Sequence, residues 1–523
     1  ESRSFHDTTK AFTGPEQHFR NSVKAESGGF SFQPSAPYRL QMEISNGRFV
    51  PESQWQYMIR HDLDADRGQD PHSDLFSPGY FEAPLIGGRT VQLLAETGPP
   101  SSLAAPPADA LLPERSPLES KTAAGLRPIE VLEKSLGHYV VDRGGLKTVI
   151  AGYPWFLDWG RDSLIFARGL IAAGRFEDAR AVLMLFGQYE DRGTLPNMIR
   201  GTDAGNRDTS DAPLWFAVAC SELAAAEGGG RFLKSDCGGR TVKQVIASIA
   251  RAIIAGTPNG VKMDPDSGLV FSPSHFTWMD TNFPAGSPRQ GYPVEIQVFW
   301  HATLTFLARI DKKDGRRWRA LAETVRESLV TLFWQPALGC LADCLHAAPG
   351  QAARRAEADD HLRPNQLFAV TLGAVAEPER ARQILRACEE LLVPGAIRSL
   401  ADRPVGRALP VHYNGNLVND PHRPYWGQYF GDEDTRRKPA YHNGTAWTWP
   451  FPSYCEAWAM THGEQGRQTA LSWLTSSIRL LESGCLGHLP EVIDGDYPHT
   501  TRGCDAQAWG ASEWVRVWLK LTR

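Results

Sequence analysis

The feature that most restricts the fold is a series of paired helical patterns that begins near residue 125. Apolar residues recur there with the spacing of one helical face, and the pattern divides into twelve segments. Their predicted starts are residues 127, 162, 175, 211, 241, 294, 315, 364, 377, 445, 465 and 506. Short turns such as 172–175 join paired segments, whereas long loops rich in glycine, proline and aromatic residues separate the pairs. Six helical hairpins predict a mainly α fold, an (α/α)6 toroid, with the long and therefore functional loops at one mouth.

The N-terminal part of the chain has a different pattern. Short alternating or apolar runs, such as Tyr38–Ile44 and Thr90–Glu96, lie between turn residues and predict strands. Six prolines between 97 and 124 then break any regular element. The predicted parts are therefore a strand-rich domain at 1–105, a proline-rich linker at 106–124 and a helical domain at 125–523.

Composition and charge exclude several classes of function. With 523 residues, 42% of them hydrophobic, the chain can form two or more domains with a large core. The net charge of -5 gives no basic footprint, so we expect no nucleic-acid partner. No run of about eighteen apolar residues predicts a membrane helix, and no signal peptide is recognisable. Eight scattered cysteines without a Cys-x-x-Cys pair indicate reduced thiols, a cytoplasmic location and no metal site or other cofactor.

The densest group of candidate ligand contacts lies at 151–162, in the sequence AGYPWFLDWGRD. Four rings and three charged side chains fall within ten residues there, a pattern that no single amphipathic helix produces. Aromatic rings can cover the C–H face of a pyranose, and charged groups can hydrogen-bond its hydroxyls. Any one ring could instead belong to the core. The density favours a loop lining a sugar-binding cleft, with these candidate contacts: Trp155, Asp158, Trp159, Arg161 and Asp162.

Two acidic segments are candidates for catalysis. Asp208 and Asp211 lie where a loop enters a helix, and either could simply cap that helix. Trp215 follows Asp211 by one turn and could form a pocket wall above that carboxyl. Glu491 stands after a proline in an apolar run, where an acid is either paired with a base such as Arg502 or poised for proton transfer. Glycoside hydrolysis needs two carboxyl groups across one sugar.

Three further clusters have the composition of a polar cleft, at 276–280 with 293–296, at 362–367 and at 441–447. Each could be structural, since polar residues at 363–366 can cap a helix and a buried His442 can be fully hydrogen-bonded. The binding candidates from these clusters are Trp278, Asp280, Glu295, Arg363, Asn365, Gln366, His442, Asn443 and Trp447.

From about residue 125 to the end, the chain resembles the C-terminal glucosidase domain of glycogen debranching enzymes, the amylo-α-1,6-glucosidase family. Six ordered motifs carry the resemblance: Trp155-Phe-x-Asp-Trp-Gly-Arg-Asp162, Asp211-Ala-x-Leu-Trp-Phe216, Thr277-Trp-Met-Asp280, Arg363-Pro-Asn-Gln366, Tyr441-His-Asn-Gly-Thr445, and the Glu491 segment ending Gln507-Ala-Trp509. Residues 76–81 are similar to the end of that family's N-terminal domain. The resemblance implies that 1–105 is a shortened antiparallel β-sandwich.

The resemblance also implies an activity, that of an inverting, exo-acting α-1,6-glucosidase without a cofactor. Asp211 matches the family's general acid and Glu491 its general base, with Gln507 and Trp509 among the substrate contacts. Inversion needs carboxyl groups roughly 6.5 to 9.5 Å apart, with a water between the base and the sugar. The implied substrates are glycogen, limit dextrin and branched malto-oligosaccharides. No segment has the pattern of a glucanotransferase barrel, so we expect only the glucosidase half of debranching.

Two other functions remain open on the sequence. The first is a noncatalytic glucan-binding protein whose shortened N-terminal domain leaves the cleft inactive. The second is a sugar epimerase or isomerase, because a helical toroid also hosts that chemistry and a fold does not fix a function.

Overall fold

The computed structural model describes residues 16–34, 39–62, 65, 72–87, 90–98, 127–281 and 286–523. Contacts between residues divide the chain into two units, Glu1–Leu126 and Arg127–Arg523, and each is described by itself. The linker predicted at 106–124 lies outside the described residues.

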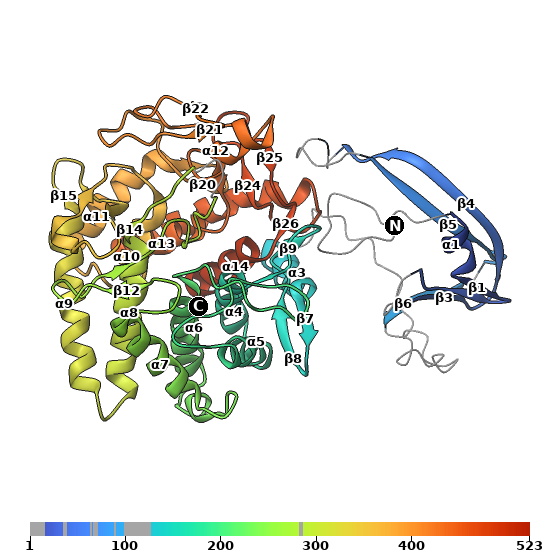
Figure 1. Ribbon diagram of the computed structural model, residues 1–523, viewed down its shortest axis with the longest axis horizontal. Coiled ribbons are helices and arrows are strands. Elements are labelled where there is room, and N and C mark those ends of the chain that lie inside the picture. The colour runs from blue at the N-terminus through green and yellow to red at the C-terminus, as the bar shows by residue number, and fades with distance from the viewer. Residues whose placement is uncertain are drawn as a thin grey trace. The chain divides into compact units, whose positions relative to one another are not determined.

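The N-terminal unit is rich in strands (Figure 1). It contains an antiparallel sheet in the order β1 (Val23–Glu26), β2 (Gly29–Phe32), β3 (Arg39–Ile44) and β6 (Leu93–Gly98), a separate antiparallel pair β4 (Arg48–Arg60) and β5 (His72–Glu82), and helix α1 (Glu16–Asn21). Aromatic rings join these parts. The ring of Phe30 on β2 lies 4.7 Å from that of Phe49 on β4, and Phe19 on α1 lies 4.9 Å from Trp55. Stacked and edge-on rings of this kind supply most of the apolar surface of a small core.

The C-terminal unit is a helical toroid (Figure 1). Within residues 127–281 and 286–523, each of these helices contacts the next around a ring: α4 (Gly160–Ala172), α6 (Ala212–Ala226), α8 (Val294–Ile310), α10 (Leu367–Thr371), α13 (Phe451–Leu474) and α14 (Ala508–Thr522). Because α14 packs against α4, the last helix closes the ring on the first. Outer helices pack on this ring: α3 (Pro128–Tyr139), α5 (Phe176–Gln188), α7 (Val242–Ala255), α9 (Gly315–Phe333) and α11 (Pro378–Cys388).

Burial patterns explain which helices are inside. Every residue of α6 from Ala212 to Cys220 is buried, as expected of a helix packed on all sides. On the outer helix α9 only one stripe is buried, which includes Trp318, Val325 and Leu329 at helical spacing. Seven helix starts lie within one residue of the positions that the periodicity predicts: Pro128, Phe176, Ala212, Val242, Val294, Gly315 and Pro378. The segments predicted near 445 and 465 correspond to one element, α13, which non-helical torsion angles at Gly463 divide in two.

Short strand pairs fix the loops at the mouth of the ring. The sheet β19 (Leu392–Val393), β20 (Ala396–Arg398), β23 (Ala446–Trp447), β24 (Val492–Ile493) and β25 (Thr501–Arg502) is antiparallel throughout. It places Trp447 directly opposite Val492, the neighbour of Glu491. Two further pairs join β26 (Ala506–Gln507) to β9 (Gly152–Tyr153), and β10 (Asp158–Trp159) to β11 (Met198–Ile199). The pairing of β26 with β9 thus brings a segment near the C-terminal end of this unit beside one near its N-terminal end.

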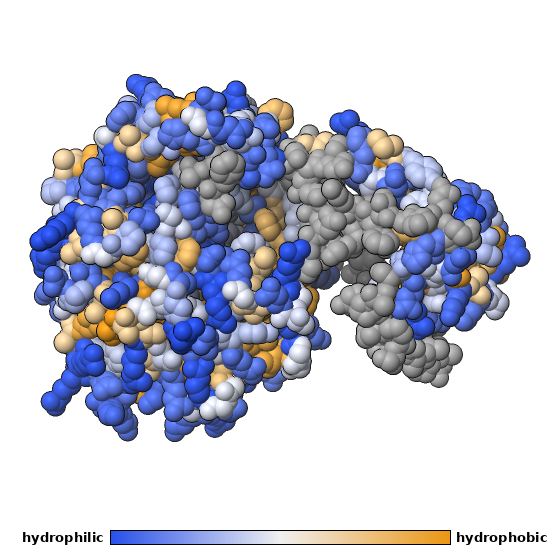
Figure 2. Space-filling model, in the orientation of Figure 1, coloured by the Kyte–Doolittle hydropathy of each residue, from blue (hydrophilic) through white to orange (hydrophobic). Residues whose placement is uncertain are grey.

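The exterior of this unit is mostly hydrophilic on the face shown in Figure 2, with apolar residues in small scattered groups. Among the residues that the structure describes, none of the helices combines the length and apolarity needed to cross a bilayer. The eight cysteines all lie in described segments and form no disulfide.

Candidate active site

A cavity of about 380 Å³ opens among these loops and helix starts. It is lined by Phe156, Trp159, Arg161, Asp162, Trp278, Asp280, Tyr441, Trp447, Glu491, Gln507 and Trp509. Nine of these side chains were predicted contacts. The other two, Phe156 and Tyr441, lie inside the quoted motifs, beside residues that were chosen, so proximity in sequence was the signal for them. Flat rings on several walls with a few acidic groups between them are the composition expected of a site for a sugar.

Asp280 is the most accessible of the three acidic residues that line the cavity. Its side chain keeps 31% of its surface exposed, and Nη1 of Arg161 lies 3.2 Å from its Oδ2. His442 Nε2 lies 3.9 Å from Oδ1. Burial raises the pKa of Asp280, although Arg161 acts in the opposite direction. A carboxyl group with a raised pKa that reaches a cavity is suited to donating a proton.

Glu491 is fixed in orientation at another part of the wall. The hydroxyl of Tyr441 donates to its Oε1 at 2.5 Å, and the backbone N–H of Cys504 donates to its Oε2 at 3.2 Å. Its own backbone N–H donates to the Cys504 carbonyl at 2.7 Å. These bonds hold the carboxylate from both oxygens, so the group is oriented before a substrate binds.

Asp162 is the third acid of the cavity and lies in the first turn of α4. Burial raises its pKa to about 8, and the nearby charges of Glu491 and Asp280 act in the same direction. Asp162 is therefore largely protonated at neutral pH. Gln507, on the same wall, has its amide nitrogen 3.4 Å from Oδ1 of Asp162; with the amide turned over, it donates to the Ala151 carbonyl and accepts from the Trp509 indole, each at 3.2 Å.

Asp211, predicted to be the general acid, lies behind the cavity. It immediately precedes α6, its exposed surface is 0%, and its Oδ2 accepts from Nε of Arg161 at 2.5 Å. The Thr209 hydroxyl donates to its other oxygen at 2.7 Å. A side chain without exposed surface cannot reach a ligand in the cavity, so this placement does not support the catalytic assignment. Trp215 is likewise a core residue, 1% exposed and 4.1 Å from the Phe299 ring.

Three other predicted contacts also lie away from the cavity lining. Asp158 is buried in an ion pair with Arg143 at 2.8 Å, and burial raises its pKa to about 6. Asp208 is exposed in the loop before α6, and Trp155 is half-buried. Asp158 and Trp155 are sequence neighbours of the lining residues Trp159 and Phe156, but their own side chains do not line the cavity.

The remaining predicted residues form a supporting layer. Asn365 accepts from the Trp278 indole at 2.6 Å and donates to Asp343 at 2.8 Å. Two oxygens of Glu295 accept from Arg289, each at 2.6 Å, and Arg289 also donates to Asp343 at 2.6 Å. This buried network therefore fixes the indole that faces the cavity.

Four further predicted contacts are also buried behind the cavity lining. The ring of His442 stacks on Trp447 with centroids 5.2 Å apart, and burial lowers the pKa of His442 well below its usual range. Arg363 donates to the Asn443 side chain at 2.8 Å. The side-chain oxygen of Gln366 accepts from the Leu341 backbone at 3.0 Å. These four predicted contacts are buried supports and do not line the cavity.

Comparison with known families supports the relationship seen in the motifs. Residues 134–516 match the family model described as amylo-alpha-1,6-glucosidase, and residues 1–92 match the one described as glycogen debranching enzyme N terminal. The chain is 22% identical over 427 residues to the glycogen debranching enzyme of Saccharomyces cerevisiae. That match includes 64% of this chain but only 26% of the yeast protein, so the chain corresponds to about a quarter of its relative.

Solved structures share the fold at low sequence identity. A glycosidase variant in complex with glucose superposes with a TM-score of 0.50 at 14% identity, covering 76% of this chain and 97% of that one. An uncharacterized conserved protein from Thermus thermophilus gives the same TM-score and identity over 76% of this chain and all (100%) of its own. These similarities extend over most of the helical unit's length.

Proposed function

Because the chain belongs to the amylo-α-1,6-glucosidase family, we propose that it is an inverting, exo-acting α-1,6-glucosidase. It is a glycoside hydrolase of the debranching type, and the proposed reaction releases single glucose residues from the branch points of glycogen, limit dextrin or branched malto-oligosaccharides. The observation that carries the proposal is the presence of Asp280 and Glu491 in one cavity whose other walls are largely aromatic.

In the proposed mechanism Asp280, and not Asp211, is the general acid. Its proton passes to the glycosidic oxygen as the bond from that oxygen to the anomeric carbon breaks. Glu491 accepts a proton from the water that attacks the anomeric carbon on the opposite face, so the product is β-glucose. Asp162 is the alternative acid, because it lines the same cavity and its pKa is raised to about 8.

The aromatic walls are proposed to hold the sugar during this reaction. Phe156 and Trp159 line the cavity with partly exposed rings, whose faces can cover the apolar side of a glucose ring, and the more deeply buried Trp278, Trp447 and Trp509 complete the aromatic wall. Arg161 is held by Asp211 at its Nε and by the Thr277 carbonyl at 2.9 Å, which leaves its Nη1 side toward Asp280. A fixed guanidinium there can orient Asp280 and hydroxyl groups of the substrate.

The domain roles follow the same proposal. We assign catalysis to an (α/α)6 toroid formed by the helical unit and regard the strand-rich unit as a shortened β-sandwich domain. The proposed reaction needs no cofactor, since acid, base and binding groups are all side chains of the cavity. A cytoplasmic location, an α-glucan as the partner, and the absence of nucleic-acid and membrane partners stay predictions from the sequence.

Proton NMR of freshly mixed enzyme and limit dextrin tests the proposal. Early β-glucose, before mutarotation mixes the anomers, is the expected result. Early α-glucose would require a retaining mechanism, and a new sugar without hydrolysis would indicate an epimerase. Binding without any product would favour the noncatalytic alternative. The Glu491→Gln variant should bind the dextrin and release no glucose.

A further inference from the structure

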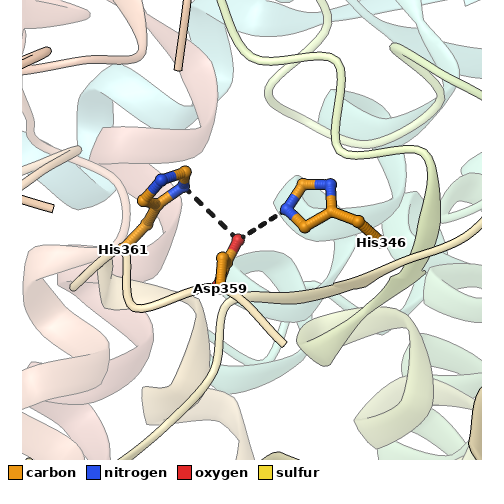
Figure 3. A group of neighbouring side chains, drawn as sticks. All are labelled: His346, Asp359 and His361. Carbon is orange, nitrogen blue, oxygen red and sulfur yellow. Dashed lines mark hydrogen bonds and ion pairs between the residues drawn. The ribbon is translucent and has the colours of Figure 1, made fainter. Parts of the chain in front are cut away.

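Away from the cavity lining, two histidines converge on one buried carboxylate (Figure 3). His346 ends β17 (Cys344–His346), and Asp359 follows β18 (Glu357–Ala358), with His361 two residues later. His346 Nε2 and His361 Nδ1 lie 2.9 and 3.4 Å from the same oxygen, Oδ2 of Asp359. The three ligand atoms lie within 4.8 Å of one another. Figure 3 shows both rings turned toward that oxygen.

The other oxygen of the carboxylate is already bonded. Oδ1 of Asp359 accepts from the backbone N–H of Asp343 at 2.8 Å and of Cys344 at 3.2 Å. These two bonds fix the plane of the carboxylate and direct Oδ2 toward the imidazoles. The carboxylate is therefore prearranged toward the two imidazoles, as metal-binding carboxylates are when their second oxygen is held by the protein.

The hydrogen bonds of His361 require either a proton or a bound cation between its Nδ1 and the Asp359 carboxylate. His361 Nε2 lies 2.9 Å from the Arg407 carbonyl, which can only accept, so Nε2 carries a hydrogen. In the neutral ring Nδ1 then presents a lone pair to Oδ2 of Asp359. His361 and Asp359 are 3% and 1% exposed, so no bulk water separates these two acceptors. A second proton on His361 or a bound cation would resolve the conflict.

We propose that His346, Asp359 and His361 form a binding site for a divalent transition-metal ion, with zinc the best-suited ion. Two imidazoles and one carboxylate are ligands that zinc prefers. Zinc bonds of about 2.0–2.1 Å in tetrahedral geometry place ligand atoms roughly 3.3 Å apart. Two of the three separations, 2.9 and 3.4 Å, are close to that value, and the third is within 4.8 Å. The hydrogen bond from His361 Nε2 to a backbone carbonyl is the usual partner of a metal-bound imidazole.

Such an ion would connect segments that support the cavity wall. Asp343, whose N–H holds the ligand carboxylate, also receives bonds from Arg289 and from Asn365, the partner of Trp278. The site is built on β17, β18 and the following loop, with Arg407 from a fourth segment. We therefore infer a structural role, in which the metal stabilises this wall. The inference does not depend on the proposed reaction.

Metal titration of the full, untagged protein tests the site. After removal of metal by a chelator and dialysis, the protein is expected to bind one equivalent of Zn²⁺, and Co²⁺ should give a visible absorption spectrum of nitrogen and oxygen ligands. Zn²⁺ should also raise the melting temperature. His346→Gln removes one ligand at the most exposed of the three positions, and we expect its affinity for Zn²⁺ to fall at least about tenfold. His301→Gln, a half-buried histidine on α8, is the matched control and should bind like the parent.

Two results would overturn the proposal. The first is the absence of a saturable equivalent of Zn²⁺ in the parent protein, which would leave an imidazolium–carboxylate pair as the explanation of the cluster. The second is equal affinity in His346→Gln and His301→Gln, which would place the bound metal elsewhere. If His346→Gln does not fold, as judged by circular dichroism, the stoichiometry and the Co²⁺ spectrum of the parent protein decide the question.

Discussion

At the scale of the residue, Arg161 connects two carboxylates with different surroundings. Its Nε lies 2.5 Å from Asp211 and its Nη1 lies 3.2 Å from Asp280. Asp211 is fully buried, whereas the Asp280 side chain is 31% exposed and lines the cavity. Of these two carboxylates, only Asp280 lines the cavity in which a glycosidic oxygen would lie. In our proposal Asp280 therefore donates the proton, and Asp211 holds Arg161 in position.

Asp280→Asn is expected to lower turnover of an α-1,6-linked substrate by roughly 10²–10⁴-fold, because an amide cannot act as the acid. The fluoride of α-glucosyl fluoride leaves without a proton, so turnover of that substrate should fall far less. Steady-state kinetics on both substrates measures the difference, and Glu491→Gln should lose both activities. An equal loss on both substrates in Asp280→Asn would contradict its role. If Asp162→Asn shows the selective loss, the alternative acid is correct.

Asp211→Ala should instead reduce stability. It leaves the buried guanidinium of Arg161 without its closest partner, and breaking a buried ion pair costs about 3–5 kcal/mol. Urea unfolding followed by tryptophan fluorescence measures the change, with Asp280→Asn as the comparison. We expect the larger loss in Asp211→Ala, since Asp280 is partly exposed. Equal unfolding free energies in the parent protein and Asp211→Ala would refute the structural role.

Asp162 predicts a pH dependence of stability. Its pKa is raised to about 8 in the folded protein, mainly by burial, against about 3.9 for an unfolded aspartate. The folded state therefore holds a proton that the unfolded chain releases, and the stabilisation is complete below pH about 4 and lost as pH rises to about 8. Relative to Asp162→Asn, the parent should lose stability from pH about 5 to 8, by up to about 1.4 kcal/mol per unit.

Urea titrations at several pH values measure this difference. Asp142→Asn, with a side chain 90% exposed on β7 (Val140–Arg143), reports the effect of losing one surface charge. A constant difference between Asp162→Asn and the parent at all pH values would show that Asp162 is ionised in the folded protein.

The sequence predicted the composition of the cavity better than the role of each residue. Trp278 and Trp447 were recognised from clusters with the composition of a polar cleft, and Trp509 from the family resemblance. The position of Asp211 before a helix is equally clear in the sequence, but the direction of its carboxyl is not. The carboxyl direction depends on its bond to Arg161, which lies fifty residues earlier in the chain. A contact between residues so far apart cannot be seen in the local sequence.

At the scale of the element, the kink in α13 has a definite backbone requirement. Gly463 has φ 65° and ψ -146°, a combination accessible essentially to glycine alone. An added Cβ would have no atom within 4 Å, so the strain of Gly463→Ala comes from the backbone. We expect a loss of about 1–3 kcal/mol. Gly137→Ala in α3, where the same change suits a regular helix, should be neutral or stabilising by up to about 1 kcal/mol.

Chemical denaturation of the two alanine variants measures both effects. Opposite signs are expected. If Gly463→Ala is as stable as the parent protein, α13 can continue through this position as a regular helix and the kink is not fixed by its backbone.

Helices were predictable where their periodicity is long, and the short strands were not. Outer helices such as α9 and α7 bury one stripe each, and their starts match the sequence pattern within one residue. Strands of two or three residues, such as β17 and β18, are too short to show an alternation. The cluster of His346, Asp359 and His361 depends on those strands, which explains why no metal site was expected from the sequence.

At the scale of the whole molecule, closure of the helical ring depends on contact between its first and last helices. Gly169 on α4 has no room for a Cβ, which would meet Ser512 of α14 at 2.5 Å. Beside this close approach, Arg168 of α4 pairs with Glu513 of α14. Glu513 also binds Arg516, which reaches Glu456 on α13. A buried ionic network therefore connects three neighbouring helices of the ring at the point where it closes.

Glu513→Gln tests whether this network maintains the closed ring. Glu513 is fully buried, so loss of its charge leaves Arg168 and Arg516 with less compensation in a region without water. We expect the free energy of unfolding to fall by about 3 kcal/mol. The control is Glu464→Gln, which removes an exposed pair with Arg467 and should cost at most about 1 kcal/mol. Trp509 lies one turn before Glu513 on α14 and lines the cavity. Opening of the ring should therefore abolish activity at the same denaturant concentration at which tryptophan fluorescence changes. Activity that survives after the fluorescence transition would mean that the cavity does not need the closed ring.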